Sequence, residues 1–74
     1  MNNSETVTIG THEVLGTLTY KRGVKGAPPG EFEGWVRRSA HNQNMIVARR
    51  FYGRNWWQLT SYENVISFEP KVRP

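Results

Sequence analysis

The segment that most constrains the fold is residues 21–30, which carries three glycines and the adjacent pair Pro28 and Pro29. Neither a helix nor a central β-strand tolerates this density of glycine and proline. We therefore interpret residues 21–30 as a long, basic, exposed loop, with the regular structure of the chain on either side of it.

The segments on both sides of this loop have the pattern of short strands. Residues 7–20 are rich in β-branched side chains and are interrupted by Gly10 and Gly16, which is typical of two short strands or one bent strand. Residues 32–38 alternate between two faces when extended, which predicts another strand. A helix is not expected in either segment.

A hairpin follows. Residues 39–44 are almost wholly polar and predict its connection, and residues 45–52 predict its second arm. The second arm also contains good helix formers, so a helical turn is an open alternative at this point. Residues 53–55 predict a tight turn, and residues 56–59 predict a third short strand.

The C-terminal part predicts one turn of tight helix at residues 60–64, followed by a last strand at residues 65–69. Only 36% of the 74 residues are hydrophobic, so the core is modest and the chain forms one domain. We predict an all-β small barrel of four to five short antiparallel strands over residues 7–69, with tails at residues 1–6 and 70–74.

This order of elements resembles the SH3-like barrels, a group that includes Tudor and KOW modules. The residues that carry the resemblance are 31–38, 56–59 and 61–68, and it covers roughly residues 14–69. Such barrels bind peptides, nucleic acids or larger assemblies and seldom catalyse reactions, so the resemblance implies a binding module without identifying its ligand.

The charge pattern favours an anionic partner. Ten lysines and arginines outweigh six glutamates, which gives a net charge of +4, and residues 34–62 contain no acidic side chain. If the two hairpin arms pair, arginines come near one another across the strands, which is unfavourable unless an anion lies on them. Guanidinium groups match phosphate and carboxylate groups. The candidate patch is Arg37, Arg38, Arg49, Arg50 and Arg54.

The alternative for these arginines is a solvated face on which they pair with glutamates of the same chain. Those glutamates would be Glu31, Glu33, Glu63 or Glu69.

Aromatic residues lie between the arginines. Adjacent residues of a strand point to opposite faces, so one of Trp56 and Trp57 can fill the core while the other is exposed or half-exposed. An exposed ring could stack on a nucleic-acid base, anchor a protein interface or form part of a cage for a cation. The alternative is that both tryptophans are largely buried. The candidate partner-binding aromatics are Trp35, Tyr52 and Trp57, and a secondary basic loop contains Lys21, Arg22 and Lys25.

No catalytic constellation is present. The chain has no cysteine, and His12 and His41 are spaced neither as metal ligands nor beside a nucleophile. We predict no catalytic residue, no metal, no cofactor and no enzymatic activity. The N-terminal residues lack the pattern of a secretion signal, and no apolar run approaches the length of a membrane span, so we expect no membrane partner and a cytoplasmic location.

In length, basicity and lack of cysteine and catalytic motifs, the chain resembles small phage-encoded proteins that bind bacterial host machinery, notably regulators of host RNA polymerase. The resemblance implies a regulator that docks on a large protein machine such as the transcription apparatus. The alternative is direct binding of DNA or RNA through the arginine and aromatic surface. The sequence leaves the oligomeric state open.

Overall fold

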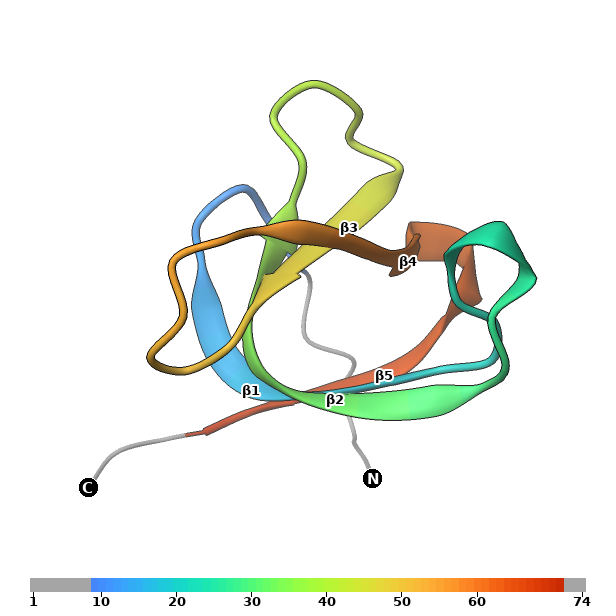
Figure 1. Ribbon diagram of the computed structural model, residues 1–74, viewed down its shortest axis with the longest axis horizontal. Helices are drawn as coiled ribbons and strands as arrows, with labels where there is room; N and C mark the ends of the chain where they lie inside the picture. Colours follow the sequence, from blue (N-terminus) through green and yellow to red (C-terminus); the bar gives the residue numbers. More distant parts are fainter. Residues whose placement is uncertain (1–8, 72–74) are drawn as a thin grey trace, which may run out of the picture.

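A computed structural model describes residues 9–71, which form a single five-stranded antiparallel sheet with the strand order β4-β3-β2-β1-β5. Figure 1 shows the sheet curled, with β3 and β4 on one side of the interior and β1, β2 and β5 on the other. Two single turns of 3-10 helix, η1 and η2, lie in the connections. The elements are β1 (Val14–Tyr20), η1 (Val24–Gly26), β2 (Gly30–Arg38), β3 (Met45–Arg49), β4 (Trp57–Ser61), η2 (Tyr62–Asn64) and β5 (Val65–Pro70).

The predicted all-β barrel of short antiparallel strands is confirmed, including the helical turn that directly precedes the last strand. The hairpin arm at residues 45–52 is a strand only over Met45–Arg49, and the alternative of a helical turn there is wrong. The strand ends early because β2 pairs with β3 only as far as the pair Trp35 and Arg49. Arg50 lies beyond the strand, and the last two residues of the predicted arm, Phe51 and Tyr52, lie in a turn.

Paired glycines allow β1 and β2 to bend around the core. Gly16 of β1 lies opposite Gly34 of β2. A Cβ atom on Gly16 would lie 2.7 Å from the ring of Phe68, and one on Gly34 would lie 2.7 Å from the carbonyl oxygen of Arg49. Both glycines are therefore required by the close approach of neighbouring chain segments rather than by turn geometry.

The interior is filled by aliphatic side chains and one phenylalanine. Leu18 of β1 lies at the centre, paired with Phe32 on one side and Phe68 on the other. Burial of these side chains is the main stabilising contribution in a domain of this size. The buried cluster consists of Ile9, Leu18, Val36, Ile46, Ala48, Leu59 and Phe68.

Among residues 9–71, one polar side chain is fully buried. The hydroxyl of Thr60 in β4 donates a hydrogen bond of 2.6 Å to the carbonyl oxygen of Arg22, which satisfies both groups away from water. This bond fixes the basic loop between β1 and β2 against the opposite side of the sheet.

The described residues also bear on the predicted boundaries. The predicted tail at residues 1–6 lies outside them. At the other end β5 extends to Pro70, and the amide of Lys71 donates to the carbonyl oxygen of Leu15 at 2.8 Å. Over residues 9–71, no helix has the length and apolar character needed to cross a membrane.

Candidate arginine and aromatic binding site

The register of the β2–β3 hairpin separates the arginines. Trp35 lies opposite Arg49, Arg37 opposite Val47, and Arg38 opposite Ile46. No two arginines are paired directly opposite each other in this hairpin. Arg37 and Arg49 still come near each other diagonally across the strands, because the inward-facing apolar residues of both strands set the register.

Arg38 is occupied within the fold. Its Nε donates to the carbonyl oxygen of Ile9 at 2.5 Å, and its Nη1 donates to the carbonyl oxygen of Gln43 at 2.8 Å. Its guanidinium also lies 3.9 Å from the centroid of the Tyr62 ring. Arg38 thus joins the N-terminal end of the described chain, the β2–β3 connection and η2.

Arg37 and Arg49 lie near the same tryptophan. Their guanidinium carbons are 4.4 Å and 5.2 Å from the centroid of the Trp56 ring. Arg49 also donates to the carbonyl oxygen of Gly53 at 2.7 Å and forms an ion pair of 3.1 Å with Glu13. Only 18% of its side chain is exposed, so Arg49 is a structural residue of the β3–β4 connection.

The β3–β4 connection begins with a tight turn over residues 50–53, closed by a 2.9 Å hydrogen bond from the amide of Gly53 to the carbonyl oxygen of Arg50. The two central positions of this turn hold Phe51 and Tyr52, whose exposed fractions are 44% and 90%. Turn centres usually hold glycine, proline or small polar residues. Two exposed aromatics at this place are a local departure of the kind expected at functional sites.

Trp35 of β2 contacts the turn through a hydrogen bond and a ring stack. The indole Nε1 donates to the carbonyl oxygen of Phe51 at 3.1 Å, and the two rings stack with their centroids 6.1 Å apart. The ring of Tyr52 meets that of Phe51 edge-on at 4.5 Å. Together with the bond from Arg49 to Gly53, these contacts fix the geometry of the turn.

Two arginines remain exposed beside this turn. The guanidinium carbon of Arg50 lies 5.8 Å from the centroid of the Trp57 ring. Trp57 is 37% exposed, and its ring packs edge-on against that of Phe32. Within residues 9–71, neither Arg50 nor Arg54 has a carboxylate within ion-pair distance. A hollow of about 290 Å³ is lined by Arg50, Gly53, Arg54, Asn55 and Trp57. We call the following residues the turn site: Arg50, Phe51, Tyr52, Arg54, Asn55 and Trp57.

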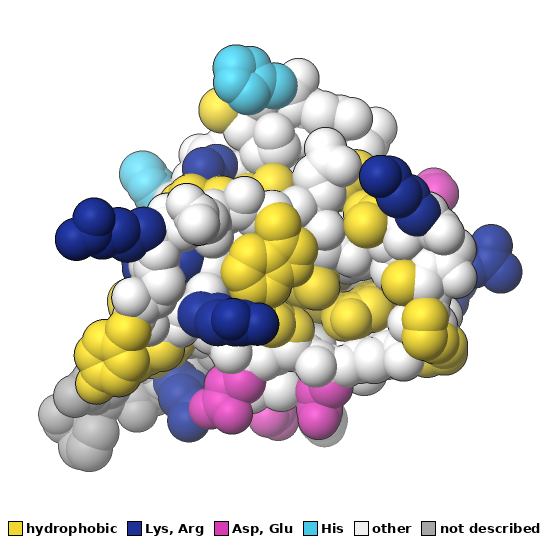
Figure 2. Space-filling view, in the orientation of Figure 1, with side chains coloured by type: hydrophobic (Ala, Val, Ile, Leu, Met, Phe, Trp, Pro, Cys, Tyr) yellow, Lys and Arg dark blue, Asp and Glu magenta, His cyan; other side chains and the backbone are white. Residues whose placement is uncertain are grey.

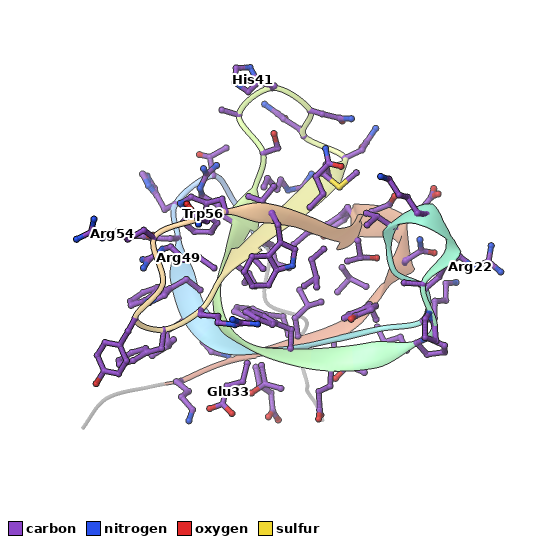
Figure 3. The ribbon with its side chains drawn as sticks, viewed as in Figure 1. Arg22, Glu33, His41, Arg49, Arg54 and Trp56 are labelled. Carbon is purple, nitrogen blue, oxygen red and sulfur yellow. The ribbon has the colours of Figure 1, made fainter. Side chains whose placement is uncertain are left out.

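The acidic side chains lie mainly elsewhere. Thr17 is paired with both Glu33 and Glu69, so these carboxylates share the outer face of β2, β1 and β5. Figure 2 shows acidic groups along the lower edge of the molecule, and Figure 3 labels Glu33 there. Among the described residues, no arginine pairs with the four glutamates considered above: Glu31, Glu33, Glu63 and Glu69.

The secondary basic loop is a separate surface. Lys21, Arg22 and Lys25 are exposed, and the first two line a hollow of about 360 Å³ with Asn64. Figure 3 shows Arg22 and Arg54 at opposite ends of the molecule, whose longest extent is 34 Å. The basic loop and the arginines of the hairpin therefore do not form one continuous patch.

Neither of the adjacent tryptophans is in the core. Trp56 precedes β4 and is half-buried beside Arg37 and Arg49, and Trp57 is at the surface. The expectation that one of them fills the core is wrong, because Leu59 is the residue that β4 contributes to the apolar cluster. Both histidines are exposed, and residues 9–71 contain no group of three side chains suited to hold a metal ion.

The structure thus divides the predicted site residues. Arg50, Arg54 and Trp57 line one hollow, and Tyr52 lies in the adjoining turn, where its ring contacts Phe51. Arg37, Arg38, Arg49 and Trp35 mainly contact groups of the chain itself. The sequence prediction missed Phe51 and Asn55. The sequence signal for Phe51 was its aromatic ring between Arg50 and Tyr52, and the signal for Asn55 was its place in the predicted turn at residues 53–55.

Comparison of the chain with protein-family models, with curated proteins and with solved structures gives no match.

Proposed function

We propose that this protein is a non-catalytic docking module that binds a protein partner through the turn site and regulates a large assembly such as the transcription apparatus. The observation that carries the proposal is the pair of exposed aromatics, Phe51 and Tyr52, at the centre of a tight turn. Arg50 and Arg54 flank them. Aromatic and arginine side chains dominate the binding energy of small protein interfaces.

The distribution of positive charge favours a protein over a nucleic acid as the partner. Binding to a phosphate backbone draws its affinity from several cations that follow the strand. Here Arg38 and Arg49 donate to carbonyl groups of the chain itself, and the basic loop lies at the far end of the molecule. The turn site itself has two guanidinium groups, those of Arg50 and Arg54, that form no ion pair within residues 9–71, and they lie beside a larger aromatic surface.

The identity of the assembly rests on the resemblance to small phage-encoded regulators, which makes bacterial RNA polymerase the specific machine to test. The architectural resemblance to SH3-like barrels also supports a binding role. The second candidate is direct DNA or RNA binding, and the 90% exposure of the Tyr52 ring favours it, since an exposed ring of this kind can stack on a base.

The test is affinity capture from bacterial lysate with and without nuclease, followed by mass spectrometry, using the parent protein and two variants. We expect one or a few protein subunits to remain after nuclease treatment, to be lost with Tyr52→Ser and to be retained with the control Arg22→Gln. Tyr52 is 90% exposed, so its replacement leaves the core intact.

Loss of all captured material with nuclease would contradict protein docking and favour the nucleic-acid alternative. In that case the affinity for an oligonucleotide should fall with salt with a log–log slope of about −0.7 to −0.9 per phosphate contacted.

A further inference from the structure

We infer that the turn site recognises an acidic segment of its partner, in which a carboxylate binds at Arg50 and Arg54 and a neighbouring apolar side chain packs beside Phe51. This inference rests on the proposed function, because it assigns a chemistry to the surface of the partner.

Two positive charges without an ion-pair partner among residues 9–71 lie at one hollow. Arg50 and Arg54 line the same hollow of about 290 Å³, together with the side-chain amide of Asn55 and the ring of Trp57. Carboxylates accept paired hydrogen bonds from guanidinium groups, and the Asn55 amide supplies a further donor. Among residues 9–71 no carboxylate forms an ion pair with either arginine, so this charge is available to a ligand.

A second hollow flanks the same turn. It has a volume of about 500 Å³ and is lined by the apolar side chains of Leu15 and Phe51, by Gly34 and by the ion-paired Glu33 and Lys71. Phe51 directly follows Arg50 in the chain, so the two hollows flank the same turn. A ligand with an apolar side chain next to an acidic one therefore matches both hollows at once.

The charges around the second hollow distinguish a short acidic segment from a polyanion. Glu33 lines that hollow and shares its outer face with Glu69. A nucleic acid that continued from Arg50 past Phe51 would bring its next phosphates towards these carboxylates. One or two acidic side chains of a protein can remain at Arg50 and Arg54, with an uncharged side chain beside Phe51.

The geometry of the turn is set in advance, which lowers the entropic cost of binding. Trp35 donates to the carbonyl oxygen of Phe51, and Arg49 donates to that of Gly53. Arg50 and Tyr52 project from a backbone that is already fixed by these two bonds.

The test is a titration of the isotope-labelled protein, followed by nuclear magnetic resonance, with three probes. The first is a blocked peptide in which one leucine lies between two glutamates. The second is the same peptide with glutamines in place of the glutamates. The third is a ten-nucleotide thymidine oligomer.

We expect the acidic peptide to shift the indole N–H signal of Trp57 and the side-chain Nε–H signals of Arg50 and Arg54. The glutamine peptide should bind at least about tenfold more weakly, because a charge-assisted hydrogen bond contributes more than a neutral one. Arg50→Gln and Arg54→Gln should each weaken binding of the acidic peptide by about tenfold. The matched control Arg22→Gln, which removes the same charge at the opposite end, should change it by less than about twofold.

Three results would overturn the inference: no shift of these signals with the acidic peptide, equal affinity for the glutamine peptide, or tighter binding of the oligonucleotide. The dispersion of the amide signals confirms in the same spectra that each variant is folded.

The same variants separate this inference from the proposed function. A nuclease-resistant complex that requires Tyr52 but survives neutralisation of Arg50 and Arg54 would refute the acidic ligand and support docking. A positive peptide titration without any nuclease-resistant complex would refute the docking function and support the carboxylate site.

Discussion

Arg49 and Arg50 are adjacent in the chain and carry the same charge, yet the structure predicts opposite consequences for their replacement. We expect Arg49→Gln to destabilise the protein strongly and Arg50→Gln to leave its stability almost unchanged. The reason is that Arg49 donates to the carbonyl oxygen of Gly53 and pairs with Glu13, whereas Arg50 is exposed and only approaches the Trp57 ring.

The magnitude follows from the contacts of Arg49. The hydrogen bond from its charged guanidinium to Gly53 contributes about 1.5–3 kcal/mol. The ion pair contributes only about 0.2–1 kcal/mol, because the Glu13 side chain is 48% exposed and screened by water. The guanidinium also lies near the rings of Trp35 and Trp56, and each cation–π contact contributes about 0.5–1 kcal/mol to stability. Since glutamine keeps part of the packing, we expect a net loss of about 2–4 kcal/mol.

Urea and thermal unfolding followed by circular dichroism and tryptophan fluorescence measure this loss. A loss of about 2–4 kcal/mol corresponds to a decrease in Tm of at least about 10 °C in a domain of this size. Arg50→Gln and Arg54→Gln serve as controls with the same change in charge, and each should change the free energy of unfolding by less than about 0.5 kcal/mol. The division of the arginines would be refuted if Arg49→Gln were as stable as the parent, or if Arg50→Gln were equally destabilised.

Three further predictions concern the fold. Thr60→Val keeps the shape of the side chain but leaves the carbonyl oxygen of Arg22 without its donor. Urea unfolding should therefore show a free energy of unfolding that is lower by about 1–3 kcal/mol, with a smaller decrease for Thr60→Ser, which keeps the hydroxyl. Gly16→Ala should lower the free energy of unfolding by at least about 1–3 kcal/mol in the same assay, because the added methyl group would lie 2.7 Å from the Phe68 ring. An unchanged unfolding midpoint would contradict the close packing of β1 and β5. Lys25→Gly should raise the free energy of unfolding by about 1 kcal/mol, since Lys25 has the left-handed φ of 58°, and a decrease would show that the lysine side chain stabilises the loop.

The strands were predictable because their signals are local. The glycines and prolines of residues 21–30, the polar connection at residues 39–44 and the alternation of residues 32–38 each act over a few neighbouring residues. The end of β3 was not predictable in this way. Phe51 and Tyr52 have strand-forming side chains, but the pairing of β2 with β3 ends at Trp35 and Arg49. The two residues lie in a turn that is closed by the bond from Gly53 to Arg50 and contacted by Trp35, sixteen residues before Phe51.

The roles of the arginines depended on contacts between distant parts of the chain. From the sequence, Arg38 and Arg54 are equivalent positive residues within one acid-free segment. In the fold, Arg38 donates to Ile9, which lies 29 residues away, whereas Arg54 projects outward from the turn. A guanidinium group serves equally well as a structural donor and as a ligand for an anion, so the residue type does not distinguish the two roles.

The sequence by itself therefore determined the all-β class, a total of four to five short strands, and the excess of arginine and aromatic side chains in the hairpin. These properties follow from backbone preferences and composition, which act locally or on the chain as a whole. Only the tertiary structure decided which arginines remain free, that neither Trp56 nor Trp57 is in the core, and that the basic loop lies away from the turn site. Each of these depends on strand register and on the curvature of the sheet. Register and curvature determine which of several chemically similar side chains are buried or bonded within the fold, and local sequence preferences do not distinguish these side chains.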